Sequence, residues 1–471
     1  MAPPEPAANL LLITFDQWRG DWGDPHNPVV VLPALQQLAA EGWSAQRCIT
    51  ASPHCVPARM SWITGLQPSQ LGVTRNSDVS LPRDAPSVVR PLQELGWHTA
   101  LIGKTHWSSH HKTGDLREHR PLLGALGFDT VEEVAGPRAL RRMECALTDA
   151  WRAAGVLEAQ RADLTKRYGQ GRTAAAWTIR PSVLPQALYP DIWIADRGLE
   201  LLDSMPSNQP WLLWICFTGP HEPFDTPAPW HGLHSNSALP LPTPKPSWID
   251  SLPQHAELKR CADGWRELLT PEQIQACRAD YADHLKLLND QLQNILQKLN
   301  QRSDADNTAV ALTSDHGDML GDAGMLYKGT FLESAIRVPF IYRAPKRTGQ
   351  HPQNLSNQAL ALTDLLGQIL EGLPRGGALQ PILRWGARQP GAVAEFANER
   401  LYVRGQRKLC LDAEGVPIWA TDLAGDPSEQ INVWPRGGVL HPRWQRLKSW
   451  AQREQALRSQ PGWLWRRLAN P

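Results

Sequence analysis

Four runs of mostly apolar residues divide the first two thirds of the chain. They cover residues 9–15, 97–102, 211–217 and 308–314. Apolar residues follow one another in these runs instead of alternating with polar ones, which is typical of strands buried on both faces of a parallel sheet. Between the runs, apolar residues recur at three- and four-residue steps, most clearly over 277–300, and predict helices. We therefore expect an α/β fold whose large, mainly parallel sheet is sandwiched by helices.

The pattern changes beyond about residue 376. Short runs with strand character cover residues 401–404, 407–411 and 418–420, and a helix rich in Trp and Arg is expected from His441. These elements predict a small antiparallel sheet with one helix. We accordingly divide the chain into a large α/β domain, residues 1–375, and a small C-terminal α+β subdomain, residues 376–471.

Two segments of the large domain do not fit its strand and helix pattern. Residues 116–185 are rich in Arg and Ala, carry helical stretches such as 139–154, and are predicted to cover one face of the sheet as an insertion. Residues 225–255 are rich in Pro, Trp, His and Ser and predict a long irregular loop. Long loops of this kind often act as lids or select substrates.

The composition of the chain excludes several classes of protein. Among 471 residues, 48 Lys and Arg are balanced by 47 Asp and Glu, so we expect neither nucleic acid nor a charged membrane surface as a partner. No apolar run is long enough to span a bilayer, and the N-terminus has no signal-peptide pattern. Seven scattered cysteines without a CxxC pair favour a reducing compartment over a disulfide framework. We predict a cytoplasmic protein.

Each of the four apolar runs ends in polar residues with chemical potential. In chain order these are Asp16-Gln17, Lys104 with His106, His221, and Asp315-His316. The carboxyl ends of parallel strands meet at one edge of a sheet, where open α/β sheets bind ligands. Asp16, Gln17, Asp315 and His316 would then bring together oxygen donors and one imidazole. This donor set suits Ca²⁺, Mn²⁺ or Mg²⁺ better than a thiolate zinc site.

The stretch 52–61 adds a cysteine to this group. Pro57 suits the first turn of a helix, which would put Cys55 at the helix mouth, where backbone N–H groups favour an anion. Arg59 lies one turn further on and is expected to reach back toward the same anion. The alternative is a buried, unreactive cysteine. Five cationic or titratable side chains would form a rim suited to a tetrahedral oxyanion: Arg59, Lys104, His106, His221 and Lys328.

Taken together, these residues resemble type I sulfatases of the alkaline phosphatase superfamily, a group that includes phosphonate monoester hydrolases. Residues 55–59 match the CxPxR signature, and the remaining motifs follow in the family's order: 16–17, 103–106, 220–223, 315–318 and Lys328. The resemblance implies an alkaline phosphatase-like fold and oxidation of Cys55 to formylglycine (3-oxoalanine) by a separate maturation enzyme. It also implies one divalent metal ion, Ca²⁺ or Mn²⁺, held by Asp16, Gln17, residue 55, Asp315 and His316.

The resemblance further assigns roles to the cationic residues. Arg59 and Lys104 would hold a hydrated formylglycine, one hydroxyl of which attacks sulfur. His221 or Lys328 would help the alcohol to leave, and His106 would take the proton as the second hydroxyl expels sulfate. Lys104, His221 and Lys328 would also bind the substrate. Asn76 falls where the phosphonate branch has an active-site Asn, although a loop Asn is also commonly structural.

The motifs indicate different classes of substrate. Asp16-Gln17 and Asp315-His316 resemble phosphonate monoester hydrolases and choline sulfatases, whereas Lys104 with His106 is the sulfatase form. Hydrolysis of a small-molecule sulfate ester is the leading hypothesis. A phosphonate monoester or phosphodiester hydrolase with the same nucleophile is the second, and a non-catalytic anion-binding protein with unmodified Cys55 is the third. A homo-oligomer is left open, since residues 463–467 suit either an interface or a packed helix end.

Overall fold

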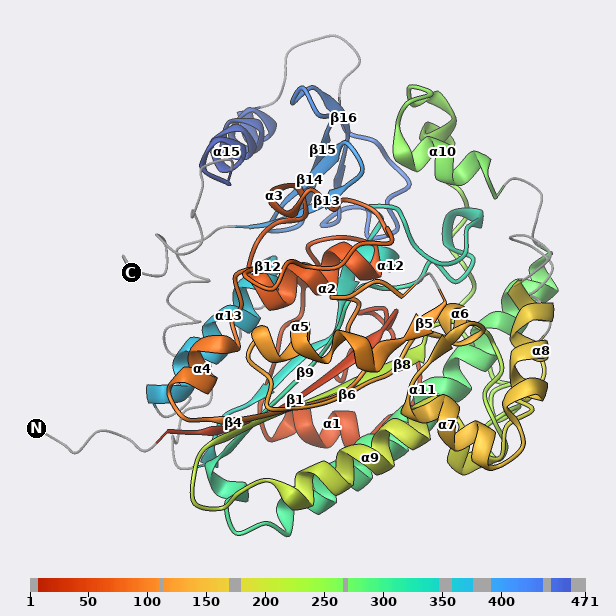
Figure 1. The fold of residues 1–471 in the computed structure, drawn as a ribbon. Coiled ribbons are helices and arrows are strands. Elements are labelled where there is room, and N and C mark those ends of the chain that lie inside the picture. Colours follow the sequence, from red (N-terminus) through yellow and green to blue (C-terminus); the bar gives the residue numbers. More distant parts are fainter. Residues whose placement is uncertain are drawn as a thin grey trace, which may run out of the picture.

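A seven-stranded sheet forms the centre of the computed structural model, which describes residues 7–110, 113–168, 179–265, 270–346, 358–375, 391–434 and 442–458 (Figure 1). The strand order is β2-β11-β9-β1-β8-β4-β6. The five neighbouring strands from β9 to β6 are parallel. Strand β11 pairs antiparallel with β9 on one side and with β2 on the other. The prediction of a large, mainly parallel sheet is confirmed. Its strands are β1 (Asn9–Asp16), β2 (Trp43–Ser44), β4 (His98–Gly103), β6 (Thr130–Glu133), β8 (Trp211–Pro220), β9 (Thr308–Ser314) and β11 (Phe340–Arg343).

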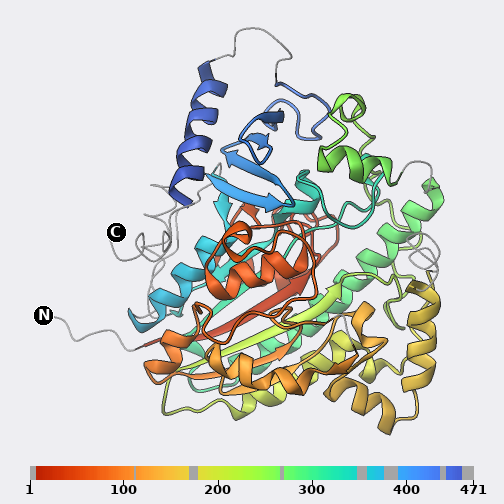
Figure 2. The same ribbon diagram turned by 45° about the horizontal axis from the view of Figure 1, so that its top comes forward.

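Helices cover both faces of this sheet (Figures 1 and 2). Leu11 and Ile13 of β1 pack with one group of helices, and Leu10 and Leu12 pack with the other, as expected for a strand buried on both faces. The first group comprises α1 (Pro33–Ala40), α9 (Pro190–Ser204) and α11 (Pro271–Asn300). The second comprises α2 (Cys55–Thr64), α4 (Arg90–Glu94), α5 (Arg120–Ala125) and α13 (Leu362–Gly372). No helix in the described ranges is both long and apolar enough to cross a membrane.

The four predicted parallel strands are immediate neighbours in the order β9-β1-β8-β4. Their pairing register aligns their carboxyl ends, since Phe15 lies opposite Ser314, Asp16 opposite Pro220 and Gly103 opposite Cys216. The polar residues that follow these strands therefore meet at one edge of the sheet, as predicted.

The segment 116–185 does more than cover the sheet. It supplies the edge strand β6, and the helix predicted over 139–154 is divided into α6 (Pro137–Leu140), β7 (Met143–Glu144) and α7 (Ala146–Ala153). The strand was missed because β6 has the sequence Thr-Val-Glu-Glu and is only partly buried, so it lacks the apolar run of a central strand. The strand β5 (Gly114–Asp115) directly precedes the segment, and α8 (Leu157–Tyr168) lies within it. Residues 169–178 lie outside the described residues.

Residues 337–343 form two short strands instead of one continuous strand. Pro339, which cannot donate a backbone hydrogen bond, separates β10 (Arg337–Val338) from β11. Whereas β11 joins the large sheet, β10 joins β3 (Cys48–Ile49) and β12 (Leu360–Ala361) in a separate three-stranded sheet. The predicted long loop is confirmed: residues 225–255 contain only a short 3₁₀ turn at Ser247–Ser251, and α10 (Glu257–Asp263) follows them.

The C-terminal antiparallel sheet has four strands, β13 (Ala392–Phe396), β14 (Glu399–Arg404), β15 (Arg407–Leu411) and β16 (Pro417–Asp422). Val393 and Tyr402 on one face pack against α15 (Pro442–Arg458), while Ala392 and Leu401 on the other join the core of the large sheet. The predicted antiparallel sheet and helix are confirmed, but β13 was not foreseen. The domain boundary at 375/376 borders the undescribed residues 376–390 and stays a prediction. Residues 463–467 also lie outside the described residues.

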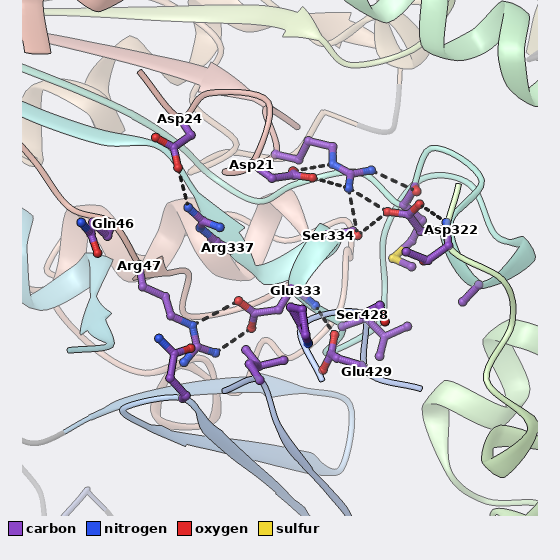
Figure 3. Close-up of a pocket in the computed structure, with 18 of the residues that line it drawn as sticks. Asp21, Asp24, Gln46, Arg47, Asp322, Glu333, Ser334, Arg337, Ser428 and Glu429 are labelled. Atoms are coloured by element: carbon purple, nitrogen blue, oxygen red, sulfur yellow. Dashed lines mark hydrogen bonds and ion pairs between the residues drawn. The ribbon is translucent and has the colours of Figure 1, made fainter. Parts of the chain in front are cut away.

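A charged cavity of about 570 Å³ lies where the C-terminal sheet meets the large domain (Figure 3). Each arginine in its described wall has a carboxylate partner. Arg19 pairs with Asp21 and Asp322 at 2.7 Å, Arg47 with Glu333 at 2.8 Å, and Arg337 with Asp24 at 3.2 Å. These ion pairs neutralise the cavity from within, so it is a structural junction between the two parts of the chain.

Lys408 on β15 extends this junction. Its side chain is fully buried, and its Nζ lies 2.6 Å from Glu429 Oε1 and 3.2 Å from Glu333 Oε1. Glu333 begins the short helix α12 (Glu333–Ile336), and its backbone N–H donates to Glu429 Oε2 at 2.8 Å. One buried ammonium group thus joins the C-terminal sheet to the segment before β10. Removing it would leave the buried carboxylate of Glu429 without its cation, a change that typically destabilises strongly.

We therefore expect Lys408→Met to lower the free energy of unfolding by about 3–5 kcal/mol. Lys346→Met is the matched control, because Lys346 pairs with Asp306 where both side chains are mostly exposed, and such pairs contribute at most about 1 kcal/mol. Urea unfolding followed by tryptophan fluorescence measures both variants. Similar shifts of the two midpoints would contradict a stabilising role for the Lys408 ion pairs.

Candidate active site

Helix α2 places Cys55 at the edge of the sheet. The helix begins at Cys55 itself, two residues earlier than Pro57, and the extended His54 precedes it. The N–H of Val56 donates to Asn76 Oδ1 at 2.9 Å, and the N–H of Asn76 donates to His54 Nδ1 at 3.1 Å. Asn76 therefore caps the helix from a distant loop, and its Nδ2 lies 4.0 Å from the Cys55 sulfur.

Polar groups from four other segments surround the Cys55 sulfur. Lys328 Nζ lies 3.0 Å away, His316 Nε2 3.1 Å and Asp16 Oδ1 3.8 Å, and His106 also hydrogen-bonds to the sulfur. Burial alone would raise the pKa of the Cys55 thiol, but Lys328, Lys104 and His316 hold it well below its ordinary value. The structure therefore favours negative charge at position 55.

A potential metal-binding cluster includes the same position. Donor atoms of Asp16, Cys55, Asp315 and His316 lie within 4.8 Å of one another, and all four side chains are buried. His316 Nδ1 donates to the carbonyl of Gly317 at 3.0 Å, so its Nε2 faces the cluster and can bind a metal ion once it carries no proton. Two carboxylates and one imidazole fit a Ca²⁺, Mn²⁺ or Mg²⁺ ion, as predicted from the sequence.

Gln17 lies beside this cluster. Its N–H donates to Asp315 Oδ1 at 2.9 Å, and its Nε2 donates to Glu222 at 3.1 Å and to Asp318. The amide oxygen accepts from Lys328 Nζ at 2.6 Å. These bonds fix the amide so that its oxygen faces the Lys328 ammonium group near residue 55, and a role for Gln17 as a metal ligand stays a prediction.

Arg59 does not face the position that the sequence predicted. Its Nε lies 2.7 Å from Asp315 Oδ2, its Nη2 lies 3.4 Å from Asp16 Oδ2, and its Nη1 donates to the backbone oxygen of Lys104 at 2.6 Å. Instead of reaching back toward Cys55, the guanidinium binds the two carboxylates of the cluster. Both are completely buried, and an adjacent cation makes their burial tolerable.

Lys104 and His106 come directly after Gly103, the last residue of β4, which another residue could not easily replace. Gly103 has a φ of +108°, and a Cβ there would lie 1.9 Å from the carbonyl oxygen of Cys216. Lys104 Nζ contacts Asp16 Oδ2. Burial, followed by the charge of Lys104, lowers the pKa of His106 well below its ordinary value, so this imidazole is neutral.

A pocket of about 360 Å³ opens over this cluster. Cys55, Asn76, Lys104, His106, His221 and Lys328 all lie on its wall, so the structure brings these predicted residues together. His221 donates from Nδ1 to the carbonyl oxygen of Glu222 at 2.7 Å. Arg59 is absent from the wall, since it lies beneath the carboxylates.

Sequence reasoning missed part of the pocket wall. His110, Glu222 and Tyr327 line it, together with Arg138, Arg141 and Arg142 from the segment around α6. Three arginines within five residues, directly after Gly136-Pro137, were a visible signal in the sequence. They were interpreted as part of a covering insertion because nothing in the sequence alone places them near a distant strand end.

Residues 8–373 match the model of the sulfatase family. An arylsulfatase of Clostridium perfringens is 24% identical over 367 residues, which cover 77% of this chain and 74% of that protein. A choline-sulfatase of Rhizobium meliloti is 27% identical over 450 residues, covering 92% and 83%. The crystal structure of the phosphonate monoester hydrolase of Agrobacterium radiobacter aligns with a TM-score of 0.73 at 22% identity and covers 96% of this chain and 95% of that one, a likeness of fold. The chain therefore belongs to the sulfatase family of the alkaline phosphatase superfamily.

Proposed function

We propose that this protein hydrolyses small-molecule sulfate esters with a formylglycine nucleophile, formed from Cys55 by a maturation enzyme, and one divalent metal ion. One observation carries the proposal. Among the described residues, Cys55 alone belongs both to the metal-binding cluster and to the wall of the pocket. A nucleophile there would touch the metal ion on one side and the substrate on the other.

The oxygen-rich cluster suits one Ca²⁺ or Mn²⁺ ion. Asp16, Asp315, His316 and the modified residue 55 would hold it, with Gln17 as a further candidate. Such an ion would supply positive charge that stabilises the anionic oxygens formed during the reaction. Arg59 has a positioning role in this proposal, because it fixes the two carboxylates on which the ion depends.

The hydrated aldehyde of formylglycine would supply two hydroxyl groups on one carbon atom, one to attack sulfur and one to release sulfate. Lys104 and Lys328 lie beside this position and would bind the sulfate oxygens, whose negative charge increases in the transition state. His221 or Lys328 on the pocket wall would protonate the departing alcohol. His106, held neutral by burial and Lys104, would accept the proton of the second hydroxyl group.

A phosphonate monoester or phosphodiester substrate is the second candidate. The observation that favours it is the donor set, since Gln17 and His316 resemble the phosphonate branch. Lys104 and His106, which resemble the sulfatases, lie against the residue 55 position and favour sulfate. The cytoplasmic location and the oligomeric state stay predictions.

The choice of substrate is tested with three esters of one leaving group: 4-nitrophenyl sulfate, 4-nitrophenyl phenylphosphonate and bis(4-nitrophenyl) phosphate. We expect the highest kcat/KM for the sulfate ester, because Lys104 and His106 line the pocket together with residue 55. Release of 4-nitrophenol measures all three. Much faster turnover of either phosphorus ester would replace the leading proposal by the second.

The nucleophile is tested by protein made together with a formylglycine-generating enzyme. The peptide that contains residue 55 is expected to show loss of sulfur and two hydrogens and gain of one oxygen by mass spectrometry. We expect Cys55→Ala to reduce kcat by on the order of a thousandfold or more, since no other group can form the intermediate. Cys48→Ala, at a buried cysteine outside the pocket, is the control that keeps activity. Full activity with an unmodified thiol would overturn the mechanism.

The metal ion is tested by chelation. Dialysis against EDTA is expected to abolish hydrolysis, and Ca²⁺ or Mn²⁺ is expected to restore it. Asp315→Asn should raise the metal concentration needed for half-maximal recovery by at least about tenfold, because it removes one buried charge from the cluster. Elemental analysis of the dialysed protein is the control, and undiminished activity in metal-free protein would contradict the proposal.

A further inference from the structure

Three arginines from the segment around α6 form part of the pocket wall, and one backbone contact fixes their position. A Cβ on Gly136 would lie 2.9 Å from Lys104 Nζ, so the start of this segment packs directly on the ammonium group beside residue 55. Arg138, Arg141 and Arg142 follow within six residues and line the same pocket. These three residues are called the arginine rim below.

The arginine rim has more positive charge than its surroundings neutralise. Among the residues that the structure describes, Glu222 is the only acidic one on the pocket wall, and it pairs with Arg138 at 2.8 Å. Arg141 donates from Nε to the backbone oxygen of Arg138 at 2.9 Å. Within the described part of the chain, neither Arg141 nor Arg142 forms an ion pair with a carboxylate.

The cavity of Figure 3 provides an internal comparison. There, Arg19, Arg47 and Arg337 each pair with at least one carboxylate. In that cavity, the arginines that join parts of the chain are therefore neutralised by carboxylates of the same chain. Two guanidinium groups without a carboxylate, on the wall of a reaction pocket, are instead arranged like a site for an external anion.

Two residues of the rim, Arg138 and Arg141, are also held in place before any ligand binds. The guanidinium carbons of Arg138 and Arg141 lie 4.5 Å and 5.4 Å from the centre of the Tyr168 ring, and the Tyr168 hydroxyl donates to the backbone oxygen of Glu222 at 2.6 Å. Burial, followed by the charges of Arg142 and Arg138, lowers the pKa of Arg141, which reflects the crowding of like charges. A bound anion would relieve that repulsion.

We infer that Arg141 and Arg142 bind a second anionic group of the substrate, so that the enzyme favours sulfate esters whose alcohol portion carries a further carboxylate or sulfate. This inference rests on the proposed function. The pocket volume of about 360 Å³ is near the lower end of ligand pockets, which span roughly 300–1,000 Å³. It suits an ester with one ring and a second anion on that ring.

The rival is a cationic alcohol portion, such as the quaternary ammonium group named in the choline-sulfatase relative. The rim would repel a cation, and the acidic Glu222 on the wall already pairs with Arg138. The two alternatives therefore predict opposite charge preferences. Three substrates separate them: phenyl sulfate, 3-carboxyphenyl sulfate and 3-(trimethylammonio)phenyl sulfate.

The test compares wild-type enzyme with the double variant Arg141→Gln/Arg142→Gln. In wild type, kcat/KM should be highest for the carboxylate ester and lowest for the ammonium ester. The ratio of kcat/KM for the carboxylate ester to that for phenyl sulfate should fall by about tenfold or more in the double variant, the usual effect of losing a hydrogen bond to a charged group. Arg152→Gln, at a half-exposed arginine of α7 outside the pocket, should leave both rates unchanged.

Other outcomes are equally informative. A ratio that the double variant does not change, or a wild-type preference for the ammonium ester, would overturn the inference while phenyl sulfate turnover still supports the proposed function. If wild type hydrolyses none of the three sulfates, the proposed function fails, and binding decides the inference separately. Calorimetry should then show that 3-sulfobenzoate binds wild type at least about tenfold more tightly than benzenesulfonate does, a difference that the double variant loses. Equal binding would overturn it.

Discussion

The ion pairs of Arg59 with Asp16 and Asp315 are the interaction on which the site depends. Both carboxylates are completely buried at the ends of neighbouring strands, where an unpaired charge would cost several kcal/mol. The guanidinium reaches both of them and also donates to the backbone oxygens of Phe15 in β1 and of Lys104 after β4. It therefore fixes helix α2 over the edge of the sheet. Because Cys55 lies one helical turn before Arg59, the same interaction determines where residue 55 meets the other strands.

The sequence predicted those parts of the molecule in which local pattern and tertiary position agree. Central parallel strands are buried on both faces, so their apolar runs revealed β1, β4, β8 and β9, and the polar residues after them did meet. The edge strand β6 is only partly buried, carries no such signal and was missed for that reason. The edge strand β13 was missed although all five of its residues are buried. The direction of Arg59 was wrong because helical spacing shows which residues share a face. It cannot show that two carboxylates from other strands compete for the guanidinium.

Two parts of the chain form the pocket, and the sheet fixes the position of one more strictly than that of the other. Strand ends supply the buried cluster, whose geometry is fixed by the register of the sheet and by Gly103. The segment around α6 supplies the rim and contacts residues beside the cluster, Gly136 packing on Lys104 and Arg138 pairing with Glu222. The reacting groups are therefore rigidly placed, while the outer wall can change its charge without altering the sheet. Local sequence could show the arginines but not the strand end that they face.

The burial of α2 has a consequence for the order of events in the life of the protein. All ten residues from Cys55 to Thr64 are buried, and Pro57 and Arg59 lie within them. Under the proposed function, the maturation enzyme must reach this same stretch. A folded molecule offers it no access, so the oxidation of Cys55 has to take place on the nascent or still unfolded chain. A chain that folds first would keep its unmodified thiol. The fraction of active enzyme would therefore depend on the rate of modification relative to the rate of folding.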